Sequence, residues 1–304
     1  DNYIKAKKLF EKSIQYSIPK VNGEFLYKIN NKFIKLSSDK KFIDGRIKRA
    51  VDLDKLVPKL VDCNKNLYSY EWVNGNTLYN HNDLKIWKNF LSFSKKKLWE
   101  ETYVDDNFYE ICKEFYFDKT MSRLFLFLNN RDKSFREKHI VNGIKTNTID
   151  KLRKNFNWNK LYDGVPTKIF HGDLQFDNVI YGSSGFYLID WRQNFAGGNI
   201  GDVYYDLSKM YGGILMSYKL MKDDKNFSCF IDKNVVNYNY KIESNLEEFK
   251  SIYEKWIVDN DYDLDKVKLI TALIFLNMAP LHEKEFGNLL FFKSKQMLQE
   301  INDK

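Results

Sequence analysis

The sequence lacks a hydrophobic run long enough to cross a bilayer. Its longest nearly apolar stretch, 269–281, is interrupted by Thr271 and Asn277, whereas a spanning helix needs about 20 consecutive apolar residues. The first ten residues also lack the apolar core of a signal peptide. We therefore expect no membrane insertion.

Cysteine is scarce, and its spacing gives no sign of a disulfide framework. Three cysteines lie far apart in 304 residues, at Cys63, Cys112 and Cys229. An odd, dispersed set favours reduced thiols. We therefore expect a cytoplasmic protein.

Positive charge exceeds negative charge, but it is not concentrated in one part of the chain. The net charge is +8, and the basic residues are scattered apart from short runs such as 95–97. A nucleic-acid-binding face would gather that charge, so we expect no nucleic acid partner. An anionic substrate such as ATP is compatible with this composition, although the composition does not require one.

The chain divides into a short start, a β-rich part and a long, mainly helical part. Apolar residues at helical spacing over the first 16 positions predict an N-terminal helix, 1–19, and a helical start suggests fusion to another catalytic domain upstream. An Asn30-Asn31 turn joins two predicted strands, 25–29 and 32–36. A helix to about residue 53 and strands at 57–61 and 67–73 would complete a domain over 20–73.

Helical spacing of apolar residues dominates the rest of the sequence, 74–304, with Gly75 at the boundary. One interruption, 168–191, is predicted to be a strand, a loop and a hairpin that turns at 182–185. From residue 202 onward we expect helices again. The predicted fold class is α+β, with two lobes: a small β-rich N-lobe and a larger, mainly helical C-lobe.

Three oxygen-bearing side chains lie on the loop and the ends of this hairpin. A hairpin brings its open ends together, so Asn178 and Asp190 should be neighbours, and Asp173 precedes them on the same loop. Amide and carboxylate oxygens suit Mg²⁺, which retains water or phosphate oxygens as further ligands. Phosphoryl transfer needs little more than such a metal and a carboxylate that orients the attacking hydroxyl.

The run His171-Gly-Asp-Leu-Gln-Phe-Asp-Asn178, followed by Ile189-Asp190-Trp191, resembles the catalytic loop and metal-binding segment of the aminoglycoside phosphotransferase and choline kinase group. These enzymes are related to the protein kinases, but their substrates are small molecules. The downstream Gly201-Asp202-Val-Tyr-Tyr-Asp206 is similar to the segment that follows in that group. The resemblance implies that Asp173 orients or deprotonates the acceptor, that Asn178 and Asp190 bind Mg²⁺, and that His171 supports the loop.

The resemblance extends less closely into the N-terminal part. Lys35, on the second predicted strand, matches the lysine that contacts the ATP phosphates in kinases, although a lysine on a strand is ordinarily just solvated. Glu71-Trp72-Val73 resembles the hinge whose backbone pairs with adenine. Two features depart from the family pattern. There is no G-x-G-x-x-G, and no Glu lies between Glu24 and Glu71, which leaves Asp44 or Asp52 as candidate partners of Lys35.

The sequence gives less information about which residues bind the acceptor. Aromatic faces could bind a quaternary ammonium or a sugar, and the acidic stretch 243–265 is either an attractant for a cationic substrate or a solvated helix face. Candidate substrate contacts are Trp191, Arg192, Tyr204, Asp206 and His282.

The sequence thus predicts an ATP- and Mg²⁺-dependent phosphotransferase that acts on a small alcohol, either a sugar, a polyol or an amino alcohol such as choline. Two alternatives stay open: a nucleotide-binding pseudokinase module attached to another domain, and an aminoglycoside phosphotransferase. Residues 46–50 and 70–75 also resemble kinases of surface-polysaccharide synthesis.

Overall fold

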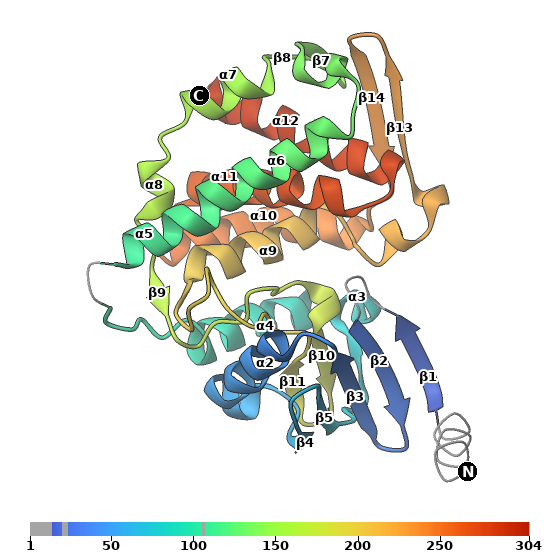
Figure 1. Ribbon diagram of the computed structural model, residues 1–304, viewed down its shortest axis with the longest axis vertical. Coiled ribbons are helices and arrows are strands. Elements are labelled where there is room, and N and C mark those ends of the chain that lie inside the picture. Colours follow the sequence, from blue (N-terminus) through green and yellow to red (C-terminus); the bar gives the residue numbers. More distant parts are fainter. Residues whose placement is uncertain (1–13, 20–23, 105–106, 304) are drawn as a thin grey trace.

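The first part of the chain forms an antiparallel sheet with one helix against it. The computed structural model describes residues 14–19, 24–104 and 107–303. Within them, the first five strands pair in the order β1-β2-β3-β5-β4, and helix α2 packs against β3 and β5 (Figure 1). The elements are β1 (Ile14–Pro19), β2 (Glu24–Ile29), β3 (Lys32–Ser37), α2 (Lys40–Leu53), the 3-10 turn Asp54–Leu56, β4 (Leu60–Cys63) and β5 (Leu67–Glu71).

Local sequence explains why these elements begin and end where they do. Asn30 adopts the left-handed region (φ 51°) at the tip of the β2–β3 hairpin, which asparagine tolerates better than most residues. Asp39 caps α2, because its side chain accepts a hydrogen bond from the Phe42 amide at 3.1 Å. The predicted β2–β3 hairpin and the helix that follows it are confirmed.

Two predicted elements of this part need correction. Residues 14–19 form the edge strand β1 rather than the end of a helix, since their backbone pairs with β2. The alternation Ile14, Tyr16, Ile18 suits a strand; the predicted helix before residue 14 lies outside the described residues. The strand expected at 57–61 begins at Leu60, because Pro58 has no N–H to donate.

A three-stranded sheet and a set of helices make up the remainder. Strands β11, β10 and β6 pair in that order, and in Figure 1 they lie beside α2 and the first sheet together with α4. This part of the chain contains β6 (Gly75–Thr77), α3 (Leu78–His81), α4 (Leu84–Lys97), the 3-10 turn Phe176–Asn178, β10 (Val179–Gly182) and β11 (Gly185–Leu188). The predicted hairpin within 168–191 is confirmed.

The larger helical part surrounds α9 and α11, which pack closely on each other. Both helices are buried around most of their circumference, as expected for the centre of a core. Its elements are α5 (Phe108–Lys113), the π-helix Glu114–Asp118, α6 (Lys119–Asn129), the 3-10 turn Lys133–Arg136, β7 (His139–Val141), β8 (Ile144–Thr146), α7 (Ile149–Asn155), α8 (Asn159–Tyr162), β9 (Pro166–Thr167), β12 (Gly201–Asp202), α9 (Val203–Leu215), the 3-10 turns Leu220–Lys222 and Asp224–Asn226, β13 (Phe227–Asp232), β14 (Val235–Tyr240), α10 (Ser244–Asp259), α11 (Leu264–Met278), the 3-10 turn Ala279–Leu281 and α12 (Lys284–Asn302).

The expectation of helices alone after residue 202 is wrong in one place. Strands β13 and β14 form a hairpin that joins β7 and β8 in a four-stranded sheet at one end of the helices (Figure 1). The burial of β14 alternates strictly through Tyr238, the period-two pattern of a half-buried strand. Among the described residues, no helix has both the length and the apolar content that a membrane crossing would need.

Candidate active site

The loop that contains Asp173 is fastened to the β10–β11 hairpin by a buried histidine. The His171 Nε2 atom lies 3.0 Å from the Ile189 carbonyl oxygen, and Nδ1 lies 3.2 Å from the Asp173 amide nitrogen. Burial lowers the pKa of His171 to about 4, so the ring is neutral at pH 7. A neutral ring with its proton on Nε2 satisfies both contacts, since Nε2 donates to the carbonyl and Nδ1 accepts from the amide.

A buried carboxylate on α9 holds the same loop from the other side. Asp206 accepts hydrogen bonds from the amides of His171 (2.9 Å) and Gly172 (2.6 Å), and from the Trp99 indole (3.2 Å). Burial raises the pKa of Asp206 to about 7, although these hydrogen bonds oppose the rise. Asp206 was expected to contact substrate, but the structure places it fully buried beneath the loop.

Glycine is required at position 172 for two reasons. Its φ of +80° lies in the left-handed region, and a Cβ atom there would sit 2.5 Å from the Cβ of Arg192. The loop therefore passes directly against the residue that follows Trp191, which draws Asp173 and Asp190 toward one place.

Asp173 faces a lysine and an amide. Its Oδ1 lies 2.7 Å from the Lys209 ammonium, and the Asn178 side-chain nitrogen donates to its Oδ2 at 3.2 Å. Burial would raise the pKa of Asp173, but the charge and hydrogen bond of Lys209 outweigh burial and hold it below the ordinary value. Asp173 is therefore ionised at neutral pH and can accept a hydrogen bond from a hydroxyl.

The Asn178 side chain contacts Asp173 through its nitrogen atom and not through its oxygen atom. Its amide nitrogen donates to the backbone and side-chain oxygens of Asp173, at 2.8 and 3.2 Å. Its backbone carbonyl accepts from the Ile189 amide at 2.9 Å. Because both amide hydrogens are used, the Asn178 side-chain oxygen is the atom that can meet a cation.

Asp190 lies where the two lobes meet. Its carboxylate forms an ion pair with Lys35 of β3, and the Arg46 guanidinium of α2 approaches to 4.0 Å. The backbone of Asp190 is in the left-handed region (φ 59°), which aspartate adopts more readily than most residues. The expected partners of Lys35 were Asp44 or Asp52; the structure instead gives Asp190, and Asp52 pairs with Lys168 at 3.1 Å.

The donor set fits a magnesium ion that is shared with phosphate groups. No group of three His, Cys, Asp or Glu side chains that could hold a metal occurs among the residues the structure describes. A site of one carboxylate and one amide oxygen needs no such group, because Mg²⁺ is commonly bound by one or two protein oxygens, substrate phosphates and water. Asp190 and Asn178 would be those two ligands.

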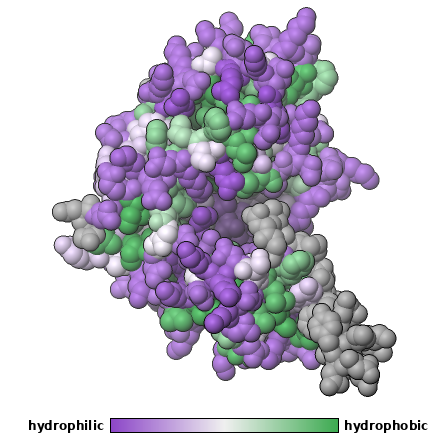
Figure 2. Space-filling model, in the orientation of Figure 1, coloured by the Kyte–Doolittle hydropathy of each residue, from purple (hydrophilic) through white to green (hydrophobic). Residues whose placement is uncertain are grey.

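A cavity of about 210 Å³ opens beside Asp173 and Asp190. On the face shown in Figure 2, the junction between the two parts of the molecule is hollowed, and the surrounding surface is mostly hydrophilic. Helices α2, α6, α9 and α11 contribute to the cavity wall. The lining side chains are polar or charged in most cases, and Tyr205 is the aromatic one.

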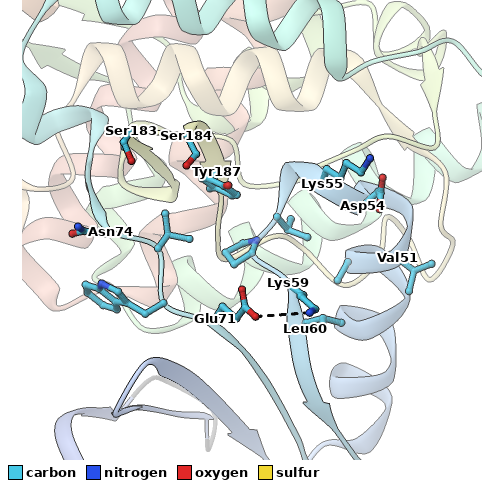
Figure 3. Close-up of a pocket in the computed structure, with 16 residues that line it drawn as sticks. Val51, Asp54, Lys55, Lys59, Leu60, Glu71, Asn74, Ser183, Ser184 and Tyr187 are labelled. Atoms are coloured by element: carbon cyan, nitrogen blue, oxygen red, sulfur yellow. Dashed lines mark ion pairs between the residues drawn. The ribbon is translucent and has the colours of Figure 1, made fainter.

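The hinge residues lie at a different and larger cavity, of about 670 Å³ (Figure 3). Glu71, Trp72 and Val73 line it together with the end of α2 and the β10–β11 turn, and Glu71 pairs with Lys59 at 4.0 Å. Neither Lys35 nor Asp190 lines this larger cavity. We therefore place the candidate chemistry at the smaller cavity despite its size.

The backbone of the hinge leaves one residue able to recognise a base. The Trp72 amide donates to the Asn31 carbonyl at 2.9 Å, and the Glu71 amide donates to the Lys59 carbonyl at 3.0 Å. The Val73 backbone has no hydrogen bond to any other described residue. Among the three predicted adenine contacts, Val73 is thus the one with a spare N–H and C=O.

The remaining predicted substrate contacts are dispersed. Arg192 lines the smaller cavity. Trp191 is fully buried and donates to the Arg46 carbonyl at 2.8 Å. Tyr204 faces Tyr262 and the Lys266 ammonium, outside the lining. His282 follows the lining residue Leu281 and stacks edge-on against Phe286.

Three cations of the cavity were not singled out from the sequence. Lys209 contacts Asp173 directly, and Lys119 and Arg123 line the wall. Nothing distinguishes these cations among 49 lysines and arginines in the sequence. A weak signal exists for Lys209, since it lies one helical turn after Asp206.

Comparison with solved structures bears on the fold. The structure of the streptomycin–ATP–APH(2″)-IIa ternary complex aligns with a TM-score of 0.53 and 15% identity, over 97% of this chain and 95% of that one. The chain has a protein-kinase-like fold. A choline kinase from Cryptosporidium parvum (TM-score 0.49, 14% identity, 98% and 92% coverage) and a Plasmodium vivax ethanolamine kinase (0.48, 13%, 97% and 85%) also align. The sequence itself matches no protein-family model and no curated protein.

Proposed function

We propose that this protein is an ATP-dependent phosphotransferase that moves the γ-phosphate to a hydroxyl of a small molecule. The observation that carries the proposal is the convergence of Asp173, Asn178 and Asp190 on a loop that His171 and Asp206 hold in place. Buried groups that fix a loop so completely are typical of sites that must be ordered before the substrate binds.

Each residue has a role in this reaction. Asp173 accepts a hydrogen bond from the acceptor hydroxyl and aligns its oxygen with the γ-phosphorus. A bond forms between that oxygen and phosphorus, while the bond to the β,γ-bridging oxygen breaks and its electron pair leaves with ADP. The hydroxyl proton passes to Asp173 and then to solvent. Most of the catalysis would come from positioning and charge stabilisation.

The nucleotide would occupy the cleft between residues 20–73 and residues 74–304. Lys35 would exchange its contact with Asp190 for the phosphates, and the Val73 backbone would pair with adenine. Mg²⁺, held by Asp190 and Asn178, would neutralise charge on the phosphates. Support comes from the ion pair that already places Lys35 beside Asp190.

ADP release with Mg-ATP tests the proposal across neutral, cationic and anionic alcohols. We expect acceptor-dependent turnover that falls at least ~100-fold in Asp190→Asn and stops when EDTA removes divalent cations. Asp177→Asn is the matched control, because Asp177 lies on the same loop and pairs with exposed Lys222. The phosphotransferase assignment would be refuted if no acceptor gave turnover. It would also be refuted if Asp190→Asn and Asp177→Asn both kept the turnover of the wild type.

A further inference from the structure

The cavity beside Asp173 carries an excess of positive charge. Five cationic side chains line it against two carboxylates, and both carboxylates already have cationic neighbours. Asp173 pairs with Lys209, and Asp190 pairs with Lys35. The cations that line it are Arg46, Lys119, Arg123, Arg192 and Lys209.

Three of these cations have no acidic partner within the part of the chain that the structure describes. Lys119, Arg123 and Arg192 form no ion pair with a described carboxylate, and Arg192 Nε donates to the Asn194 carbonyl at 2.8 Å. Burial lowers the pKa of Lys119, and the neighbouring charges of Arg192, Lys209 and Arg123 lower it further. The cluster repels itself in the absence of an anion.

Lys119 and Arg192 lie over two nearby aromatic rings, of which Tyr205 lines the cavity. The Lys119 ammonium lies 3.9 Å from the Phe115 ring centroid and 5.3 Å from that of Tyr205. The Arg192 guanidinium lies 5.1 Å from the Phe115 centroid. A quaternary ammonium would find these rings occupied, and no residue of the acidic stretch 243–265 lines the cavity.

Two cations of the cluster, Lys119 and Arg123, lie on the C-lobe side of the cavity. Lys119 and Arg123 lie one turn apart on α6 and so share a face of that helix. Along with Ile274 and Asn277 of α11, they form the C-lobe wall of the cavity. Lys35 and Arg46, which flank Asp190, come from the opposite lobe.

We infer that the acceptor is a small alcohol that carries a carboxylate or phosphate group, bound by Lys119, Arg123 and Arg192 while its hydroxyl faces Asp173. This inference rests on the proposed phosphotransferase function. Guanidinium groups bind both kinds of anion through paired hydrogen bonds. The volume of about 210 Å³ suits a single sugar-sized molecule, because pockets for larger ligands run from about 300 to 1,000 Å³.

Four acceptors built on one sugar ring test the inference: glucose, glucosamine, glucuronic acid and glucose 6-phosphate. With Mg-ATP, we expect KM for at least one of the two anions to be roughly ten-fold lower than for glucose, with glucosamine weakest. Whichever anion is preferred tells whether a carboxylate or a phosphate is recognised. Preference for glucose or glucosamine would overturn the inference and leave the kinase proposal standing.

The variant Arg123→Gln tests whether the anionic group of the acceptor binds at this part of the cavity. We expect it to raise KM for the preferred anion about ten-fold, with kcat and the KM for ATP unchanged within about two-fold. Arg136→Gln, an exposed arginine outside the cavity, is the matched control and should change none of these values. A rise in the KM for ATP in Arg123→Gln, with no effect on the acceptor, would assign the cluster to the nucleotide and overturn the inference.

Calorimetric titration of the nucleotide-free protein separates the two proposals. Binding of glucuronic acid or glucose 6-phosphate, but not glucose, that is weakened in Arg123→Gln and retained in Arg136→Gln supports the anion site even where no sugar is phosphorylated. Absence of turnover would then count against the phosphotransferase function alone. Equal binding of glucose and the anions, or no anion binding, overturns the inference; Lys119→Met gives a second variant should Arg123→Gln fail to fold.

Discussion

The loop that carries Asp173 and the helical wall opposite it are organised in contrary ways. In the loop, two buried side chains hold the backbone: His171 bridges two backbone groups, and Asp206 accepts from two amides. In the wall, Lys119 and Arg123 line a cavity with no described carboxylate paired to them. The backbone of the loop is held in place without a ligand, whereas the wall lowers its electrostatic energy when an anion binds.

This contrast predicts opposite responses to substitution. Changes in the loop should cost stability or turnover, because each removes a satisfied buried contact. Neutral replacements in the wall should leave the fold intact or stabilise it, since the cations of the wall repel one another when no anion is bound.

Asp173→Asn should have the largest effect, a loss of turnover of about 10³-fold, because the amide cannot accept the hydroxyl proton and would orient it poorly. The KM for ATP should change less than about two-fold. Steady-state kinetics with Asp177→Asn as the control check this, together with thermal unfolding, because the variant leaves Lys209 without its carboxylate. A large rise in the KM for ATP would contradict the role of Asp173 on the acceptor side.

His171 should make folding stability depend on pH. Its folded-state pKa of about 4 lies below the ordinary value of 6.5, so the folded protein favours the neutral ring. The resulting contribution is complete above about pH 6.5 and is lost as the pH falls toward 4, a change of ~3 kcal/mol.

Denaturant unfolding of the wild type and His171→Gln across pH 4–7 measures this change. The stability advantage of the wild type should shrink as the pH falls. Groups that titrate in both proteins, such as buried His139, cancel in the difference. An advantage that stays constant with pH would show that His171 is not the titrating group.

Asp206→Asn should lower the free energy of unfolding by about 2 kcal/mol, because one of the two amides that it serves would face an amide donor in place of an oxygen. Thermal and denaturant unfolding measure the loss. Asp259→Asn, on the exposed surface of α10, should change stability very little. Equal changes in the free energy of unfolding for the two substitutions would contradict the role of Asp206 in holding the loop.

Lys119→Met should be the smallest change and opposite in sign, a gain of about 1 kcal/mol in the ligand-free protein. Burial and three neighbouring cations penalise the Lys119 ammonium, so an apolar chain of similar length relieves that penalty. Unfolding midpoints compared with exposed Lys133→Met check it. A destabilised Lys119→Met would mean that the wall is satisfied as it stands.

Much of the fold followed from patterns that are local in the sequence. The Asn30-Asn31 turn, the Asp39 cap and the β10–β11 hairpin each depend on residues a few positions apart. The strand β1 and the β13–β14 hairpin were missed, although β1 pairs with the neighbouring strand β2 and β13 pairs with β14. Of these strands, β14 also pairs with β7, which lies far away in the chain. Short apolar segments of this kind suit a helix or a strand, and their packing partners decide between the two.

The sequence by itself determined which oxygen-bearing side chains lie on the loop and its hairpin, because Asp173, Asn178 and Asp190 occur within 18 residues at a spacing that one hairpin can close. Only the tertiary structure decided which cations face that loop. Lys35 meets Asp190 across 155 positions, and Lys119, Arg123 and Lys209 meet on helices far apart in the chain. The sequence does not distinguish a solvated lysine from a buried one. Only burial makes the charge costly unless it is paired with an anion.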